Sequence, residues 1–338
     1  MSASTVGEVE AHGDGPPPRR RSITAVLQVN RLSGLYLWIG LILLFGLWIP
    51  ETFLTPATLQ SIMTDQAVTV ILALGLLVSL AAGQFDLSAA QTLGVAAVLM
   101  AWMTGNKGLD PTIAIVLTLA ACLVVGLVNG LLIAWVGINS FIATLGTSSI
   151  LLSVTALVSG NQFVGPVPAG FQSLTSTKVL GVQVVVLYVI VIGVAVWYAL
   201  EHTPVGRRVS ATGASVNTAR LVGVRTNRYI VMAMIVTSLL AGIAGLLLVG
   251  RIGSVSSAIG PSYLLPAFAG CFLGTTQLKP GRFNVWGTVL SLYLLATGVK
   301  GFQLVSGQDW VTYMFNGVAL ILAVGLAVTV ERRRTHSN

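Results

Sequence analysis

Charged residues are scarce in this 338-residue chain. Only 8% of the residues are Asp, Glu, Lys or Arg, whereas a soluble domain has roughly 25%. Hydrophobic residues make up 55% of the chain and gather in long runs from one end to the other. This composition excludes an ordinary soluble protein and predicts a polytopic membrane protein.

Cysteine and histidine are almost absent. Cys122 and Cys271 both lie within apolar runs, so we interpret them as small buried hydrophobic residues and expect no disulfide framework. His12, His202 and His336 lie in expected tails or loops. No histidine is therefore left for a metal site or a proton relay inside the membrane, and we expect neither a metal ion nor a cofactor.

A phosphate-binding loop is also missing. The sequence contains no G-x-x-x-x-G-K-[ST] motif, whose backbone amides would hold nucleotide phosphates. The chain is therefore not expected to hydrolyse ATP or to carry a catalytic site. Any energy from ATP would have to arrive through a partner chain.

Ten apolar segments are long enough, or nearly long enough, for the roughly 20 residues of a membrane-spanning helix. The predicted fold class is all-α. The eighth segment is short and contains Pro266, which predicts a broken or tilted element. The segments are 34–51, 64–83, 87–104, 112–135, 140–160, 182–200, 229–250, 262–276, 284–300 and 310–330.

Basic residues indicate the orientation, because cytoplasmic loops are rich in Lys and Arg. With both termini cytoplasmic, only four of the 18 basic residues lie outside, at Lys107, Lys178, Arg251 and Lys300. The net charge of +8 is then a topology signal and a contact to anionic membrane lipid, and no nucleic-acid partner is expected. The expected cytoplasmic residues are Arg19, Arg20, Arg21, Arg31, Arg207, Arg208, Arg220, Arg225, Arg228, Lys279, Arg282, Arg332, Arg333 and Arg334.

The chain is predicted to have one folded domain between two tails. Residues 1–33, which include PPPRRR, are too polar to fold alone and predict a disordered cytoplasmic tail. Residues 34–331 form the transmembrane domain, and residues 332–338 form a second cytoplasmic tail. The first apolar run lacks a small-x-small cleavage site, so we expect a retained helix and not a signal peptide.

The cytoplasmic loop at about 201–228 contains start and stop signals for a short helix. Ser215 is placed as the N-cap, and Gly223 is placed to end the helix after about two turns. A capped helix between two spans suits docking to a cytoplasmic partner. The alternative is a solvated loop whose arginines serve only the topology.

Asp86 lies in the sequence GQFDLS between the second and third segments. Gly83 permits a turn there, and Ser88 can satisfy backbone groups at a helix end. Asp86 either caps the third helix at the cytoplasmic interface, or acts as a gate or a substrate contact at a broken helix deeper in the membrane. The number of crossings favours the interface.

Asp65 and Gln66 begin the second helix on the expected outer side. They either cap the helix and line its mouth, or they contact the transported solute. A carboxylate and an amide could hydrogen-bond a neutral polyhydroxyl solute, which needs both donors and acceptors.

Small and polar residues mark the fourth and fifth helices. Gly126 and Gly130 in GLVNG have the spacing that lets helices approach closely, with Asn129 between them. The fifth helix opens with FIATLGTSSILLS, whose hydroxyls either bond their own helix or line a translocation path. These hydroxyl residues are Thr144, Thr147, Ser148, Ser149 and Ser153.

The motif order GQFDLS, GLVNG, FIATLGT, TPVGR and LGTTQLKPGRFNVWGT resembles the permease subunits of bacterial ribose-type ATP-binding-cassette (ABC) importers. The resemblance runs from about Phe53 to Val330. Departures at Gln84, Phe85 and Asp65 bear on the identity of the solute. Departures at Ser215 and at 279–282 suggest a dedicated ATPase partner.

The resemblance implies a fold of about ten transmembrane helices with inverted halves, helices two to five matching seven to ten. It implies partners: cytoplasmic ABC ATPase subunits, a periplasmic or lipid-anchored solute-binding protein, and a second permease subunit in a homo- or heterodimer. Such a permease would move a monosaccharide or polyol inward by alternating access across the bacterial inner membrane.

Site residues are predicted in three groups on the matching motifs. Residues for gating or capping are Gly83, Asp86 and Ser88. Candidates for the translocation path are Asp65, Gln66, Asn129, Thr144, Thr147 and Ser148. Residues for coupling to the ATPase are Gly206, Arg207, Gly213, Ser215, Ala219 and Gly223.

Three alternatives remain open from the sequence. Related permeases for branched-chain amino acids or nucleosides share a similar glycine-acid-serine pattern. An ion-coupled secondary transporter would use Asp86 or Asp65 without an ATPase. A structural or receptor-like membrane protein would transport no solute.

Overall fold

The computed structural model describes residues 29–179, 181–308 and 310–335. Most of the predicted N-terminal tail, residues 1–28, and the last residues of the C-terminal tail, 336–338, lie outside the described residues. The division of the chain into a domain and two tails therefore stays a prediction.

The described fold is predominantly α-helical, as predicted, and each predicted apolar segment overlaps one of the ten main helices. Six of these helices are long and apolar enough to cross a membrane: α4, α6 with its extension, α7, α9, α12 and α14. The main helices are α2 (Val29–Trp48), α4 (Pro56–Ala81), α5 (Ala89–Ala101), α6 (Pro111–Leu131), α7 (Ser140–Ser159), α9 (Val184–His202), α12 (Thr226–Ile252), α13 (Leu264–Gly274), α14 (Val285–Ser306) and α15 (Trp310–Thr335).

Shorter elements connect the main helices. Two π-helical turns, η1 (Trp102–Asn106) and η2 (Leu132–Val136), extend α5 and α6. A two-stranded antiparallel sheet of two residues per strand precedes α9, with a turn at Gly181 (φ 81°), and such short strands leave no periodic pattern in a sequence. The remaining elements are α3 (Pro50–Phe53), α8 (Ala169–Ser176), β1 (Lys178–Val179), β2 (Val182–Gln183), α10 (Pro204–Ala214), α11 (Val216–Leu221) and the 3₁₀ turn η3 (Gly260–Tyr263).

Local capping explains where α4 and α6 begin. The Thr55 hydroxyl accepts a hydrogen bond from the Thr58 N–H at 3.2 Å, and Asp110 accepts one from the Thr112 N–H at 2.8 Å. A proline follows each cap at the first helical position, where its missing N–H costs nothing. The hydrogen bond from the Thr112 N–H to the Asp110 carboxylate lowers the pKa of Asp110.

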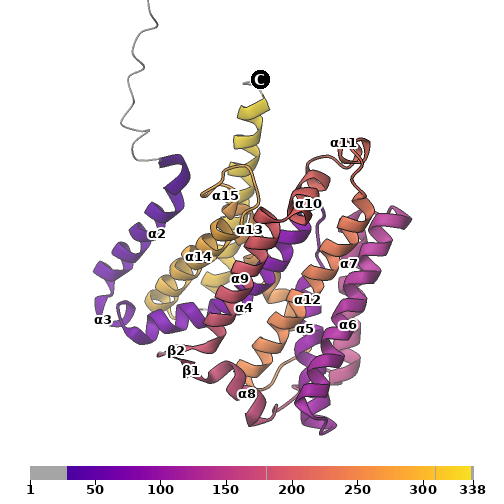
Figure 1. The fold of residues 1–338 in the computed structure, drawn as a ribbon. Coiled ribbons are helices and arrows are strands. Elements are labelled where there is room, and N and C mark those ends of the chain that lie inside the picture. The colour runs from indigo at the N-terminus through magenta and orange to yellow at the C-terminus, as the bar shows by residue number, and fades with distance from the viewer. Residues whose placement is uncertain (1–28, 180, 309, 336–338) are drawn as a thin grey trace, which may run out of the picture.

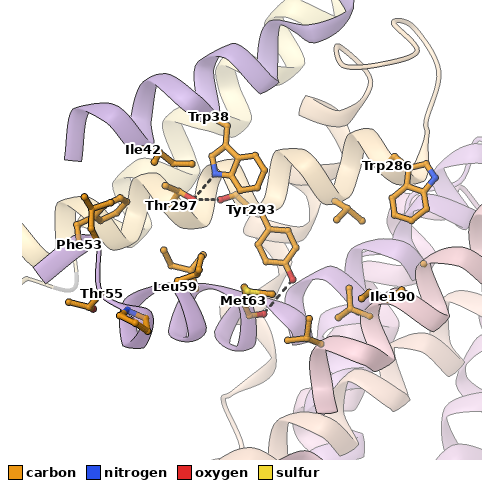
Figure 2. Close-up of a pocket in the computed structure, with 17 residues that line it drawn as sticks. Trp38, Ile42, Phe53, Thr55, Leu59, Met63, Ile190, Trp286, Tyr293 and Thr297 are labelled. Carbon is orange, nitrogen blue, oxygen red and sulfur yellow. Dashed lines mark hydrogen bonds between the residues drawn. The ribbon is translucent and has the colours of Figure 1, made fainter. Parts of the chain in front are cut away.

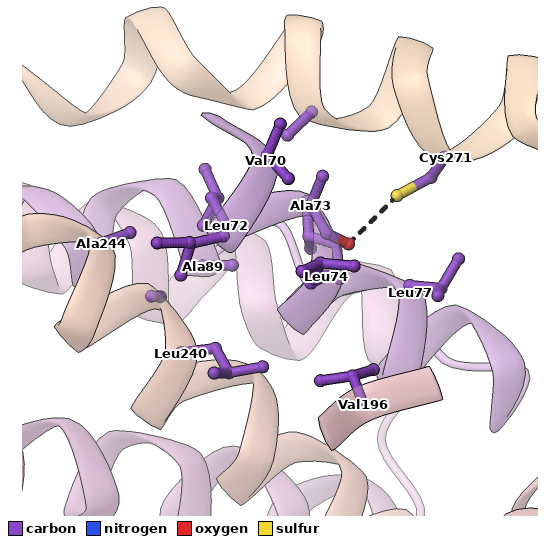
Figure 3. Packing of buried hydrophobic residues seen from close by; sticks show 14 of the residues in the cluster. Val70, Leu72, Ala73, Leu74, Leu77, Ala89, Val196, Leu240, Ala244 and Cys271 are labelled. Carbon is purple, nitrogen blue, oxygen red and sulfur yellow. Dashed lines mark hydrogen bonds between the residues drawn. The ribbon is translucent and has the colours of Figure 1, made fainter. Parts of the chain in front are cut away.

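Helix α4 forms the centre of the hydrophobic core. Its middle turns, from Val70 to Leu77, are buried on all sides against α9, α12 and α13 (Figure 3). The Cys271 thiol donates to the Ala73 carbonyl at 3.3 Å, and both cysteines of the chain are buried and free. This confirms the reading of the cysteines as small buried residues.

Helix α12 packs closely on α6, as the small residues of GLVNG predicted. A Cβ added at Gly126 would lie 2.7 Å from the Cα of Ile235, and one added at Gly130 would lie 2.8 Å from the Cα of Val231. Real Cβ atoms do not approach other atoms this closely, so only glycine allows this helix separation.

The two ends of the bundle differ in what they carry (Figure 1). Helices α10 and α11 lie at one end, together with the start of α2 and the end of α15, whereas α3, α8 and the two strands lie at the other. The eighth predicted segment begins as the 3₁₀ turn η3, which passes into the short helix α13 with helical backbone at Tyr263 and Leu264, and Pro266 lies in the first turn of α13. A Cβ at Gly260 in η3 would lie 2.5 Å from the Ala90 carbonyl oxygen, so this turn lies against α5.

Candidate functional site

Asp86 lies fully buried in the short loop that joins α4 to α5. The chain turns at Gly83, whose φ of 75° suits glycine, and the Gly83 N–H donates to the Leu80 carbonyl at the end of α4. The Asp86 Oδ1 atom accepts hydrogen bonds from the Ser88 N–H at 3.0 Å and from the Ser88 hydroxyl at 2.6 Å. The carboxylate thus bonds the residue just before α5.

Ser88 connects this loop to α6 and α7 through one amide side chain. The Asn129 Nδ2 atom donates to the Ser88 Oγ atom at 2.9 Å, and the Thr147 hydroxyl donates to the Asn129 Oδ1 atom at 2.6 Å. Asp86, Ser88, Asn129 and Thr147 therefore form one chain of hydrogen bonds, which we call the loop network. The network ties together three segments that carry predicted gating and path residues.

Hydroxyls at the start of α7 satisfy the irregular backbone of the same loop. The Phe85 N–H donates to the Ser140 hydroxyl at 3.2 Å, and the Leu87 N–H donates to the Thr144 hydroxyl at 3.0 Å. Irregular backbone at membrane depth needs partners of this kind, because no bulk water can supply them. Thr144 is fully buried, and its hydroxyl also donates to the Ser140 carbonyl of its own helix at 2.7 Å.

The later hydroxyls of α7 bond their own helix. Ser149 donates to the Leu145 carbonyl at 3.2 Å, and Ser153 donates to the Ser149 carbonyl at 3.0 Å. Ser148, one of the predicted path residues, is half-buried on the same helix. These serines thus lie beyond the loop network, toward the far end of α7.

Contrary to the prediction, Asp65 and Gln66 do not begin their helix, because the Thr55 cap starts α4 at Pro56; they lie near its middle, well away from the loop network. Gln66 and Ala81, the last residue of α4, are 15 residues apart, about 22 Å at roughly 1.5 Å per helical residue. Gln66 Nε2 donates to the Leu292 carbonyl at 3.4 Å, and Asp65 forms an ion pair with Arg251 of α12. The structure therefore splits the predicted path residues into two separate groups.

Asp65 and Gln66 line a polar cavity of about 220 Å³ between α4, η3, α13, α14 and α15. We call it the outer polar cavity. Its wall combines amides, hydroxyls and one ammonium group with a few apolar side chains. The residues that line it are Ile62, Asp65, Gln66, Thr69, Ser262, Tyr263, Pro266, Ala296, Val299, Lys300, Gln303, Thr312 and Asn316.

A second cavity of about 650 Å³ lies between α2, α4, α9 and α14, and its wall is apolar (Figure 2). The Trp38 indole N–H donates to the Thr297 hydroxyl at 2.8 Å, and the Tyr293 hydroxyl donates to the Met63 carbonyl at 3.4 Å. The polar tips of both aromatic side chains are thus bound to the protein. This cavity does not suit a solute that needs many hydrogen bonds.

The 201–228 loop forms two helices, of which the sequence predicted the second. The Ser215 hydroxyl accepts from the Thr218 N–H at 3.2 Å, and Gly223 has a φ of 83°, so the predicted cap and stop of α11 are confirmed. Helix α10 was not predicted. The signal for its start is Thr203 followed by Pro204, a capping residue before a proline. The Thr203 hydroxyl accepts from the Gly206 N–H at 3.2 Å.

The predicted coupling residues differ in their surroundings. Arg207 is exposed, and Ala219 is the buried residue of α11. Gly206 and Gly213 both pack against backbone: a Cβ at Gly206 would lie 2.1 Å from the Leu200 carbonyl oxygen, and one at Gly213 would lie 2.2 Å from the Ala81 carbonyl oxygen. Helix α10 is thereby fitted closely to the end of α4.

A further contact at this end of the bundle was not predicted. Glu201, at the end of α9, forms an ion pair with Lys279 in the turn between α13 and α14. The Trp197 indole N–H also donates to the Glu201 carboxylate at 3.1 Å. The unusual Lys279 in the GTTQLKPGR turn was the available signal, but its partner lies 78 residues away in the sequence.

A bundle of apolar helices with buried hydrogen-bond networks defines a multi-pass membrane protein. Residues 58–324 match the protein family described as the permease component of branched-chain amino acid transport systems. Because this match covers most of the chain, the chain belongs to that family. It is a transport subunit, not an enzyme.

Curated relatives extend over most of this chain. The autoinducer 2 import system permease protein LsrC of Salmonella typhimurium is 30% identical over 87% of this chain and 85% of its own length. The ribose import permease protein RbsC of Bacillus subtilis is 30% identical over 81% and 85%, and the D-allose transport system permease protein AlsC of Escherichia coli is 26% identical over 85% and 88%. No solved structure matches the chain. These matches confirm the resemblance to permease subunits of ribose-type ABC importers.

Proposed function

We propose that this chain moves a monosaccharide or polyol inward across the bacterial inner membrane, by alternating access driven by a separate ATPase subunit. The observation that carries the proposal is the similarity to import permeases for ribose and D-allose over more than four-fifths of the chain. The loop network adds physical support, because it links an element that faces α10 with the helices α6 and α7.

The proposed topology has ten spans with inverted halves and both termini in the cytoplasm. The described start of α2 and end of α15 lie at the same end of the bundle as α10 and α11 (Figure 1). An even number of crossings requires this arrangement. The basic residues of the 201–228 loop favour the cytoplasm for that end.

The proposed ATPase dock is formed by α10 and α11. Leu221 and Val222, at the tip of α11, are 88% and 75% exposed, which is unusual for neighbouring apolar side chains beside a charged loop. Binding of an ATPase subunit there would cover them. The close fit of Gly213 to Ala81 would then carry the motion from α10 to the loop that holds Asp86.

The other proposed partners follow from the family. A solute-binding protein, periplasmic or lipid-anchored, would dock at the end that carries α3, α8 and the strands. A second permease subunit would complete the pathway. Contacts along that pathway are expected to be weak, because a conduit must release its solute as readily as it accepts it.

Uptake measurements test the solute class. Deletion of the gene should abolish uptake of one labelled pentose, hexose or polyol, and a plasmid copy of the chain should restore it. Loss of branched-chain amino acid or nucleoside uptake instead would favour the related permease class. Transport by the purified chain alone in liposomes, driven by a proton gradient without an ATPase, would overturn the proposal.

A linker replacement tests the dock. Exchange of Ser215–Gly223 for a flexible Gly/Ser linker of equal length should abolish uptake and co-purification of the ATPase while membrane insertion is retained. An exchange of segment 177–183 at the opposite end for a linker should leave ATPase co-purification intact. Unchanged uptake after the first exchange would remove the docking hypothesis.

A further inference from the structure

We propose that the outer polar cavity is a binding site for one neutral polyhydroxyl solute of about monosaccharide size. The inference rests on the proposed function and deepens it, because it gives the solute a place inside the permease. Under the proposed topology the cavity lies in the outer half of the membrane, since it is built from the first half of α4, the start of α15 and the second half of α14.

Two polar side chains in the wall have no partner within the described part of the chain. Asn316 is 7% exposed and Thr69 is 4% exposed, and neither side chain forms a hydrogen bond there. Two neighbouring threonines do have partners: Thr64 of α4 donates to the Gln60 carbonyl at 2.8 Å, and Thr297 of α14 donates to the Tyr293 carbonyl at 2.7 Å. Thr118 and Thr288 also lack a partner among the described residues but lie outside the cavity wall, so what distinguishes Thr69 and Asn316 is that they face one cavity together. A mostly buried polar group without a protein partner requires water or a ligand.

Two glutamines provide further acceptors toward the same space. Gln66 uses its Nε2 atom on the Leu292 carbonyl, and Gln303 uses its Nε2 atom on the Thr312 hydroxyl at 2.8 Å. The Oε1 atom of each receives no hydrogen bond from the described residues. Amides and hydroxyls together offer both donors and acceptors, which matches a solute whose hydroxyls do both.

The charges at the cavity do not favour an anion strongly. Asp65 is paired with Arg251, whose Nη1 atom also donates to the Thr64 carbonyl at 2.7 Å. Lys300 contributes one ammonium group to the wall. Apolar side chains complete it and suit the C–H faces of a sugar ring. These are Ile62, Pro266, Ala296 and Val299.

The size of the cavity sets the size of the solute. Its volume of about 220 Å³ corresponds to roughly seven water molecules, and it lies below the roughly 300 Å³ at which drug-sized sites begin. A single sugar unit fits this space, and an oligosaccharide does not. The lining residues Asp65 and Ser262 are exposed, so the cavity reaches the surface.

Cysteine labelling in the assembled importer tests the site directly. Cys122 and Cys271 are buried, so a membrane-impermeant maleimide should label a Gln303→Cys variant selectively. The transported sugar at saturating concentration should slow this labelling, whereas labelling of a Ser306→Cys control on the same helix should not change. An unchanged rate at Gln303→Cys would overturn the inference, and stronger protection by a sugar phosphate would overturn the neutral class.

Uptake by two near-isosteric variants provides an independent test. Asn316→Leu and Thr69→Val should each lower uptake by about tenfold, the effect of losing a well-made hydrogen bond, while co-purification of the ATPase is retained. Thr64→Val is the matched control, because it removes a buried hydroxyl of α4 outside the cavity. Normal uptake by both variants would show that the cavity is not the binding site. The proposed function fails only if the unaltered importer moves no sugar.

Discussion

Gly213 of α10 packs backbone to backbone on Gly83, the glycine at which the chain turns after α4. A Cβ added at Gly83 would lie 3.0 Å from the Gly213 Cα atom, and one added at Gly213 would lie 2.8 Å from the Gly83 nitrogen. One glycine belongs to the predicted gating loop and the other to the predicted coupling element. The predicted gating loop and the predicted coupling helix are therefore in direct backbone contact.

Gly213→Ala should therefore impair transport, because its methyl group would overlap the Ala81 carbonyl and the Gly83 backbone. Overpacking of this kind costs about 1–3 kcal/mol. We expect reduced uptake and a lower unfolding temperature, measured on the purified importer. Gly170→Ala in α8 is the control, since an added Cβ there meets nothing within 4 Å. Equal behaviour of the two variants would contradict the packing argument.

Asn129→Leu should destabilise the protein, because it removes both hydrogen bonds that join Ser88 to Thr147. Leaving such buried groups without partners costs about 1–3 kcal/mol. Thr147→Val breaks one of the same hydrogen bonds. The double variant should therefore lose less free energy of unfolding than the two single variants lose in sum. Thermal unfolding of all four proteins measures this coupling, and strict additivity would show that the residues do not act as one network.

Asp86→Asn should reduce assembly or transport without changing which solutes are carried. The Asn Oδ1 atom can still accept from Ser88, but the charge-assisted bond is replaced by a neutral one that is about half as strong. Uptake of several labelled sugars measures both effects. Asp110→Asn is the exposed control, because Asn also caps a helix. An altered solute profile with normal assembly would instead place Asp86 in the path.

Asp65→Asn should cost less stability than Arg251→Met. The ion pair between these side chains is partly exposed, and exposed pairs contribute about 0–1 kcal/mol. Arg251→Met also removes the hydrogen bond to the Thr64 carbonyl, which joins α12 to α4. Unfolding curves at low and high salt measure the order of the two effects. The Asp65 carboxylate also accepts from the Ser61 hydroxyl at 2.9 Å, a bond that Asn can keep, so the reverse order would contradict this argument.

Ser215→Ala should weaken α11 by about 1 kcal/mol, because the Thr218 N–H loses its cap. Ser215→Asn retains a capping oxygen and should behave like the original protein. Co-purification of the ATPase, together with uptake, measures the effect on docking. Full activity of Ser215→Ala would show that the cap is dispensable for the proposed dock.

The sequence predicted features that depend on local physics. The cap at Ser215 and the stop at Gly223 use residues only a few positions apart, so their pattern is visible before folding. The close packing of Gly126 and Gly130 on α12 was also predictable, because small residues at this spacing leave room for one neighbouring helix. The pattern did not reveal which helix that neighbour is.

The loop network lay beyond sequence reasoning. Asn129 is 41 residues from Ser88 and 18 residues from Thr147, and no periodicity pairs residues across such intervals. The sequence grouped Gln66 with Thr144 and Thr147 as one set of path residues. The structure places Gln66 near the middle of α4, 15 residues before the end that adjoins the loop network, and adds Thr69, Gln303 and Asn316 to the group around Gln66.

Composition and motif order by themselves determined the class of protein. Apolar runs with few charges can satisfy their backbone groups in a bilayer only as helices or closed barrels, and their lengths here indicate helices. Only the tertiary structure decided that Gly83 packs on Gly213, that Asn129 hydrogen-bonds Ser88, and that polar side chains from three helices line one cavity. Such contacts depend on how distant helices pack, and packing follows from the complementarity of whole surfaces, which no single segment of sequence contains.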